Sequence, residues 1–291
     1  MSWSARIDLS IDYIERNLSK SIKIGEVAKI AGSSRYHFHR MFYSMTGVTP
    51  ADYIRRRKLT LAATDLATGD EKVINIALKY GFDSPNAFTR AFRKFHGVPP
   101  SKARMPRVRL TVFNRASIKL ETKGKVMLGY RIVEKPSFKI VGKSQNFEFD
   151  QFIKNGPKFW KDYVGSKDYK LLWELTQGGQ GEVSEAPLMS AYFPNEYGSR
   201  DIFTDVLGLE LATEDGSEKF ESFAVPSSTF AEFNCSYRNS MKTNRAIYGE
   251  WFASTGFERD SNKPDIAAYF PVAFRPLSEM RVRWWIPIIQ K

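Results

Sequence analysis

The stretch SPNAFTRAFRKFHGVPP, residues 84–100, repeats SRYHFHRMFYSMTGVTP, residues 34–50, at a shift of 50 positions. The two stretches share seven of seventeen residues, including a Phe-x-Arg-x-Phe pattern. Upstream, VINIALKYG (73–81) also resembles IGEVAKIAG (24–32), here at a shift of 49 positions instead of 50. Each copy predicts a short helix, a turn at a glycine and a second helix that begins at a serine. This order is typical of a helix-turn-helix, and here it occurs twice.

Helical angles divide each second helix into a core side and an exposed side. At about 100° per residue, Phe38 and Phe88 fall on the core sides, while Arg40 and Arg90 occupy equivalent places on the exposed sides. A helix with such a face suits the major groove of DNA, where Arg donates to guanine. The candidate DNA contacts are Arg35, Tyr36, His39, Arg40, Asn86, Thr89, Arg90, Arg93 and Lys94.

Two of the three histidines, His37 and His39, lie in the first of these helices. Residues two apart point roughly 200° from each other, whereas a helix that donates two zinc ligands spaces them at i and i+4. A catalytic pair would need a third group to orient a ring, and the segment offers none. We therefore expect neither a metal site nor a catalytic site here, and no cofactor.

A third helix is expected over 49–69, between the two repeats. As a rigid joint, it would let two recognition helices enter successive major grooves, roughly 34 Å apart. Its basic run RRRK (55–58) fits two interpretations, a solvated helix face or a set of phosphate contacts.

The net charge of +12 is confined to the first part of the chain. Residues 1–115 contain 21 Lys and Arg against 9 Asp and Glu, whereas residues 116–291 contain 23 of each. A basic segment attracts polyanions such as the phosphate backbone of nucleic acid. The single Cys235 excludes an internal disulfide framework, and no apolar window is long enough for a membrane helix. We expect a cytoplasmic, nucleoid-associated protein with no membrane contact.

Residues from about Ala5 to Arg107 resemble the DNA-binding domain of AraC/XylS-type transcription regulators. The resemblance rests on IALKYGF (76–82), the FxRxFxxxxGxxP pattern and FTRAFRKFHGVPP (88–100). It implies two helix-turn-helix units that bind double-stranded promoter DNA, with RNA polymerase as a partner. By position, it assigns base contacts to Tyr36, His39, Arg40, Asn86, Thr89 and Arg90. Pro85 and His39 depart from the residues common in relatives, which leaves the base preference open.

The rest of the chain predicts a different architecture. A DNA-binding domain over 1–110 and a linker over 111–124 are followed by a domain over 125–291 that mixes strands and helices. Strands are expected over 126–133, 138–147, 188–194, 202–211, 228–236, 265–271 and 280–288, and helices over 150–164 and 239–255. A weak repeat relates 136–148 to 226–238, which indicates two halves with a cleft between them.

This second domain resembles the GyrI-like small-molecule-binding domain, as it is attached in Rob-type members of the AraC/XylS family. The resemblance rests on IYGEWFASTGFE (247–258), DIAAYFP (265–271) and WIPI (285–288). It implies a multidomain fold, in which an all-α double helix-turn-helix domain precedes an α+β domain of two βαββ-type halves. It also implies a cleft of aromatic and acidic residues for a small-molecule effector.

Two positions depart from that pattern. Ala267 and Arg283 stand where relatives commonly carry acidic residues, and a buried carboxylate is what would hold a desolvated cation. The charge of the effector is therefore open. Trp284 and Trp285 point to opposite faces of a strand, so at least one of them is expected to pack in the core. The candidate ligand contacts are Trp160, Tyr192, Trp251, Tyr269, Arg283 and Trp285.

The sequence thus predicts a sequence-specific DNA-binding transcription regulator with a ligand-sensing or partner-contact domain. Residues 116–291 contain no histidine, metal-ligand cluster or phosphate loop, so we expect no enzyme. Two alternatives stay open for the second domain, namely a small-molecule hydrolase and a ligand sink only tethered to DNA.

Overall fold

The computed structural model describes residues 3–105, 107–116, 128–175, 181–194, 202–211, 219–270 and 279–290. The chain forms two compact units, residues 1–33 with 45–121 and residues 34–44 with 122–291. The second unit therefore includes most of a helix that the sequence assigns to DNA binding. Of the expected linker over 111–124, residues 117–124 lie outside the described residues, as do the first two residues of the strand expected over 126–133.

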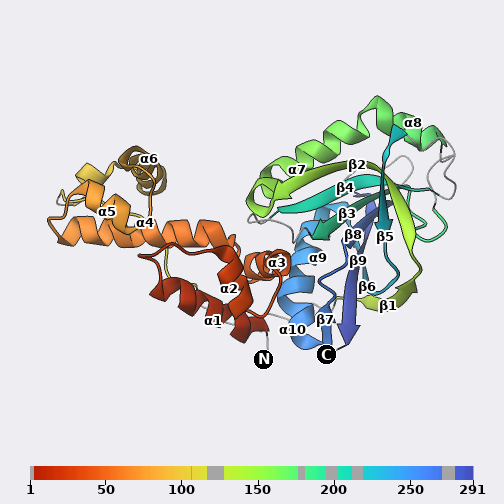
Figure 1. Cartoon of the computed structure of the whole chain (residues 1–291), viewed down its shortest axis with the longest axis horizontal. Coiled ribbons are helices and arrows are strands. Elements are labelled where there is room, and N and C mark those ends of the chain that lie inside the picture. The colour runs from red at the N-terminus through yellow and green to blue at the C-terminus, as the bar shows by residue number, and fades with distance from the viewer. Residues whose placement is uncertain are drawn as a thin grey trace. The chain divides into compact units, whose positions relative to one another are not determined.

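The first unit is helical (Figure 1). Its helices are α1 (Trp3–Arg16), α2 (Ile24–Ile30), α4 (Pro50–Thr68), α5 (Val73–Lys79), α6 (Pro85–His96) and the short η1 (Pro100–Lys102). The Ser84 hydroxyl accepts a hydrogen bond from the Ala87 amide at 3.1 Å and begins α6, as the repeat predicts. Gly81, between α5 and α6, has a φ of +71°, a conformation that other residues adopt only with strain.

The second helix-turn-helix has its own apolar core. Phe88 and Phe92 of α6 are fully buried, which confirms the core side predicted from the helical angles. They pack with Tyr80, the residue after α5, and with residues of α4 and α5, namely Leu59, Ala62, Ala63, Leu66, Ile76 and Ala77. Burial of this side fixes the opposite side of α6 toward solvent.

The second unit is an antiparallel sheet with helices. Its elements are residues 35–44 of α3 (Arg35–Thr46), β1 (Tyr130–Lys135), β2 (Phe138–Glu148), α7 (Phe149–Val164), α8 (Lys167–Leu175), β3 (Leu188–Pro194), β4 (Ile202–Glu210), β5 (Glu221–Val225), β6 (Ser228–Ser236), η3 (Tyr237–Asn239), α9 (Ser240–Ala246), the π-helical η4 (Ile247–Trp251), α10 (Phe252–Ser254), β7 (Phe257–Arg259), β8 (Asp265–Phe270) and β9 (Arg281–Gln290).

The strand order is β1-β6-β9-β8-β3-β4-β2-β5, and β7 also pairs with β9. The segments β2-α7-β3-β4 and β6-α9-β8-β9 occupy equivalent positions on the two sides of the β3–β8 pair, which confirms the predicted βαββ halves. The strands that precede the halves are exchanged, since β1 pairs with β6 and β5 pairs with β2.

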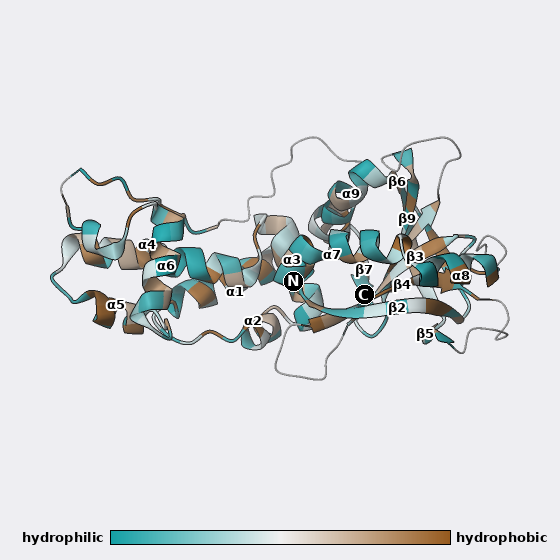
Figure 2. Cartoon of the chain, turned by 90° about the horizontal axis from the view of Figure 1, so that it is seen from above, coloured by the Kyte–Doolittle hydropathy of each residue, from teal (hydrophilic) through white to brown (hydrophobic). Residues whose placement is uncertain are grey.

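Register decides which side chains share a face of this sheet. Tyr192 lies opposite both Asp205 and Asp265, and Ala267 lies opposite Trp284, so these five side chains point to one face. The other face holds an apolar core that contains Phe138, Ile140, Met189, Val206, Phe230, Ile266 and Trp285. Figure 2, coloured by hydropathy, shows brown hydrophobic segments within the strands of the sheet.

Candidate functional site

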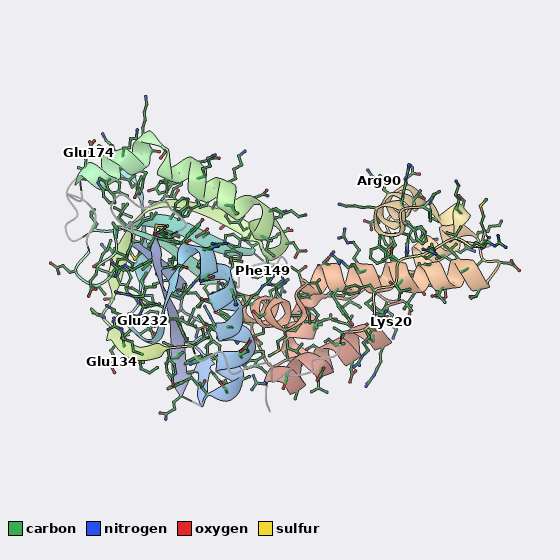
Figure 3. All side chains as sticks on the ribbon, turned by 180° about the vertical axis from the view of Figure 1, so that it is seen from behind. Lys20, Arg90, Glu134, Phe149, Glu174 and Glu232 are labelled. Atoms are coloured by element: carbon green, nitrogen blue, oxygen red, sulfur yellow. The ribbon has the colours of Figure 1, made fainter. Side chains whose placement is uncertain are left out.

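Helix α6 presents the predicted polar face. Asn86, Arg90, Arg93 and Lys94 are exposed and Thr89 is half-buried. Arg90 is labelled on α6 in Figure 3. Three basic groups on one helical face, beside an amide and a hydroxyl, provide donors for guanine and phosphate and both donors and acceptors for other base edges.

The equivalent face of α3 is not exposed. Tyr36, His39 and Arg40, which the helical angles place on a solvent-facing side, are 7%, 4% and 8% exposed. Residues far along the chain cover the side of α3 that the helical angles leave free. Arg35 is half-buried.

Arg40 lies within a ring of aromatic side chains. Its guanidinium carbon is 4.5 Å from the ring centre of Tyr248, 5.4 Å from that of Tyr36 and 5.9 Å from that of Tyr192. Trp284 adds a fourth ring at 6.0 Å. Aromatic faces attract cations, so this arrangement stabilises the buried positive charge.

The polar atoms of Arg40 are also engaged. Nη1 donates to the Tyr36 hydroxyl at 2.7 Å and forms an ion pair with Asp265 at 3.4 Å, while Nη2 donates to the Asn244 side-chain oxygen at 2.6 Å. Asp265 is itself fully buried and pairs with Arg259 at 2.9 Å. Burial raises the pKa of Tyr36 well above its ordinary value, so this hydroxyl stays protonated.

Further contacts hold α3 in place. The His39 ring stacks on Phe149, with 5.4 Å between ring centres. Arg245 donates to the Tyr43 hydroxyl and lies over the Tyr43 ring at 4.6 Å. His39, Arg40 and Tyr43 thus have partners from α7, α9, η4 and strands β3, β8 and β9.

A cavity of about 310 Å³ opens beside Arg40. Its walls come from α3, α7, η3, α9 and strands β3, β4, β8 and β9. Many of the lining residues are aromatic, including Phe149, Phe152, Trp160, Tyr192, Phe203, Tyr237, Tyr269 and Trp284. A volume of this size and an apolar wall with few polar groups are typical of a small-molecule site.

Asp205 supplies a carboxylate to this cavity. It is buried and accepts a hydrogen bond from the Ser190 hydroxyl at 2.5 Å. Burial raises its pKa from 3.8 to about 7, and the hydrogen bond from Ser190 lowers it only in part. Ala267, where an acidic residue was expected, lies on the same face and contributes no charge.

Three of the six predicted ligand contacts, Trp160, Tyr192 and Tyr269, line the cavity. Arg283 and Trp285 belong to the opposite face of the sheet, where the Trp285 indole donates to Glu232 at 3.0 Å and Arg283 lies over Phe270. The strand alternation makes Trp284 the cavity residue, and the sequence could not tell which of the two tryptophans it would be.

Trp251 lies outside the cavity as well. It packs against Phe233 and Phe257, with ring centres 5.1 Å and 5.9 Å away. Sequence reasoning missed Asp205 as a cavity residue, selected Trp285 in place of Trp284, and placed Arg40 only on DNA. A signal for Asp205 was its position within the apolar strand IFTDVLGLEL, on the side of the strand that carries Phe203 and Leu207.

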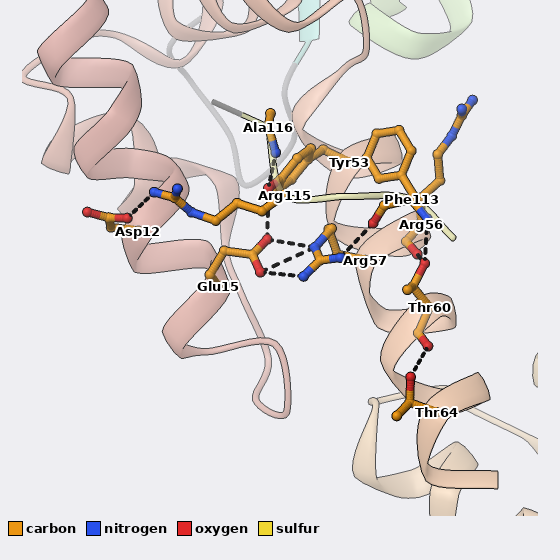
Figure 4. Close-up of polar contacts among 10 residues, drawn as sticks. All are labelled: Asp12, Glu15, Tyr53, Arg56, Arg57, Thr60, Thr64, Phe113, Arg115 and Ala116. Carbon is orange, nitrogen blue, oxygen red and sulfur yellow. Dashed lines mark hydrogen bonds and ion pairs between the residues drawn. The ribbon is translucent and has the colours of Figure 1, made fainter. Parts of the chain in front are cut away.

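The RRRK run of α4 has partners inside the first unit. Arg57 pairs with Glu15 of α1 at 2.8 Å and donates to the Phe113 carbonyl, and the Tyr53 hydroxyl donates to Glu15 at 2.7 Å (Figure 4). Lys58 donates to two backbone carbonyls. These two residues have structural partners, whereas Arg55 and Arg56 pair with Asp52 and stay partly exposed.

Comparison with known proteins finds two matched regions in the chain. Residues 131–288 match the family described as integron-associated effector binding protein, and residues 27–105 match a helix-turn-helix domain family. The Tn10 TetD protein of Escherichia coli is 46% identical over 89 residues, which cover 31% of this chain and 64% of that protein. The multiple antibiotic resistance protein MarA of Escherichia coli K12 is 39% identical over 95 residues, 33% of this chain and 75% of that protein.

An integron cassette protein of Vibrio cholerae matches with 12% identity and a TM-score of 0.41, over 55% of this chain and 96% of that one. The chain belongs to the integron-associated effector-binding family and carries an AraC-type DNA-binding domain like that of MarA. The matched stretch spans less than two thirds of the TetD protein and 44% of a Bacillus subtilis regulator, YbfP.

Among the described residues, no helix is long and apolar enough to cross a membrane. Nor does any group of three or more His, Cys, Asp or Glu side chains, within the ranges described, lie where it could hold a metal ion.

Proposed function

We propose that this protein is a sequence-specific, double-stranded DNA-binding transcription regulator whose second unit binds a small-molecule effector. The observation that carries the proposal is the exposed polar face of α6, presented by a helix-turn-helix core and joined in one chain to an aromatic cavity. Such a protein acts at promoters beside RNA polymerase, in the compartment that holds the DNA.

On the DNA side, each residue of α6 has a role that follows from its chemistry. Arg90 donates two parallel hydrogen bonds to guanine, and Asn86 and Thr89 read neighbouring base edges. Arg93 and Lys94 contact phosphates, which fix the register of the helix without reading sequence. Arg40 has the same role as Arg90 in the first recognition helix when that helix is free.

On the effector side, the cavity favours an apolar molecule with a positive charge. Its walls include many aromatic faces, and Asp205 provides a buried carboxyl group with a pKa of about 7, whose ionised form a cation would neutralise. The sequence left the charge of the effector open because the expected acidic positions are Ala267 and Arg283. Asp205, which lies in β4 instead of β8 or β9, favours a cationic effector.

Selection of binding sites from a random DNA pool with the full chain tests the DNA-binding proposal. We expect one enriched sequence, and Arg90→Ala should cost about 1–3 kcal/mol at one base step and relax the preference there. Lys94→Ala, the matched control, should weaken all sequences alike. Equal losses on selected and random duplexes for Arg90→Ala would contradict the role of Arg90, and no enrichment at all would contradict the proposed function.

A further inference from the structure

Helix α3 cannot keep its contacts within the second unit and bind DNA at the same time. The nitrogens of Arg40 that would donate to a guanine edge are bound to the Tyr36 hydroxyl and the Asn244 side chain. A helix in the major groove must expose these nitrogens together with His39, and His39 is stacked on Phe149. In the arrangement observed, α3 therefore cannot read DNA.

Arg40 is held as a cationic ligand would be held. We call the second unit without residues 34–44 the effector domain. Three of its aromatic rings, from Tyr192, Tyr248 and Trp284, surround the Arg40 guanidinium, and Asp265 supplies the opposite charge. Rings and a carboxylate around a desolvated cation are the general solution for binding such a group.

The neighbouring cavity uses some of the same side chains. Tyr192, Trp284 and Asn244 line the cavity and also contact Arg40. The rings of Tyr192 and Trp284 are stacked, with centres 5.9 Å apart, so a guest that moves one ring moves the other. A cationic guest there would also lie close to the charge of Arg40, and like charges repel strongly where water is excluded.

If Arg40 left this site, the Asp265 carboxylate would still have a positively charged partner. Asp265 keeps its ion pair with Arg259, in which both side chains are fully buried, and the Tyr248 hydroxyl also donates to Asp265. Breaking a buried ion pair costs much free energy because it leaves one charge buried without a partner. Asp265 avoids this cost because Arg259 still compensates its charge. The Arg40 guanidinium can thus exchange between this site and solvent or DNA.

We propose that Arg40 is an internal occupant of the effector site and that α3 binds either the effector domain or DNA, with the effector favouring release. The inference rests on the proposed function and adds its regulation. Because binding free energies are linked, a cation that favours the released helix tightens DNA binding by the same factor by which DNA tightens cation binding.

A disulfide can hold α3 in the observed position. A Cβ placed on Gly249 lies 3.7 Å from the Ser44 Cβ, within the range of about 3.5–4.5 Å that disulfides require. The test uses the full chain with Ser44→Cys and Gly249→Cys, in a Cys235→Ser background that removes the native thiol. Crosslinking is read from mobility on a non-reducing gel and from mass.

We expect the disulfide to form on mild oxidation and to lower specific DNA affinity at least about tenfold relative to the same protein after reduction. The single variants Ser44→Cys and Gly249→Cys, oxidised in the same way, control for the oxidant. Failure to crosslink, or equal DNA affinity of the oxidised and reduced forms, overturns the inference. Crosslinking in a protein whose reduced form selects no DNA sequence overturns the proposed function instead.

A second pair of variants avoids cysteine. Asn244→Ala removes the acceptor of Arg40 without altering α3, and we expect it to raise specific DNA affinity by about tenfold because it favours release. Lys242→Ala, an exposed residue of the same helix, is the matched control. Unchanged or weaker DNA binding by Asn244→Ala relative to Lys242→Ala also overturns the inference.

Discussion

At the scale of single residues, the side chains that matter most are charged groups inside an aromatic environment. Arg40 and Asp205 stand at the same cavity, one neutralised by Asp265 and the other without a basic partner among its hydrogen bonds to the described residues. The apolar strand around Asp205 favours burial of that residue, whereas the helix around Arg40 gives no such signal. The sequence predicted an exposed side chain for Arg40 and gave Asp205 no role.

The raised pKa of Asp205 has a consequence for stability. In the folded protein this carboxyl holds its proton up to about pH 7, whereas in the unfolded chain it loses the proton near pH 3.8. The folded state therefore binds more protons between these values, so its stability falls as the pH rises. The decline is up to about 1.4 kcal/mol per pH unit.

Asp205→Asn should abolish this part of the pH dependence and stabilise the second unit at pH 8. Denaturant unfolding followed by tryptophan fluorescence at pH 5 and pH 8 measures it. Asp260→Asn, a more exposed carboxylate of the same unit that pairs with Lys263, serves as the control. A pH profile that is identical in Asp205→Asn and the unaltered protein would contradict the burial argument.

At the scale of elements, periodicity predicted most helices and strands because each buries one side. Helix α6 and strands β2, β3, β4, β6, β8 and β9 lie close to their expected positions. Helix α8 was missed, although Gly165 ends α7 and the Ser166 hydroxyl accepts from the Tyr169 amide at 3.1 Å, which starts a new helix. Strand β5 was missed because an edge strand with exposed residues has little apolar alternation.

The contact between α1 and α4 gives a second prediction. Glu15 accepts hydrogen bonds from both Tyr53 and Arg57, which are largely buried (Figure 4). Its removal leaves the Arg57 charge without its carboxylate and the Tyr53 hydroxyl without the acceptor Glu15. Glu15→Ala should destabilise the first unit by about 2–3 kcal/mol.

Amide hydrogen exchange of α1 and α4 measures this change within the unit. The control is Asp12→Ala, also in α1, whose ion pair with Arg115 is exposed on both sides. Its removal should cost less than about 0.5 kcal/mol, since exposed pairs contribute little. Similar losses in the two variants would show that the Glu15 cluster is no more important than a surface pair.

At the scale of the whole molecule, DNA binding and effector binding are coupled through α3. A cation that occupies the cavity should raise DNA affinity, and DNA should raise cation affinity by an equal factor. Benzyltrimethylammonium, an aromatic molecule with a permanent charge, is a suitable probe. We expect it to tighten binding to the selected DNA and to slow crosslinking of the Ser44→Cys, Gly249→Cys protein.

Phenylacetate, similar in size and opposite in charge, is the matched control for this measurement. It should neither bind the cavity tightly nor alter DNA affinity, since Asp205 repels it above pH 7. Equal effects of the two probes would argue against a cationic effector, while leaving the crosslinking test of α3 unaffected.

The resemblance to the GyrI-like domain predicted the βαββ halves. The sequence by itself determined the two helix-turn-helix copies, the face of α6 and the aromatic character of the second domain. These features follow from local rules, since repeats, caps and periodic burial act over a few neighbouring residues. Tertiary structure alone decided that Arg40 meets Asp265, that Trp284 rather than Trp285 lines the cavity, and that Asp205 brings a carboxyl group to the face where Ala267 brings none. Such pairings join residues far apart in the chain, and they depend on strand register and on which surface covers a polar face.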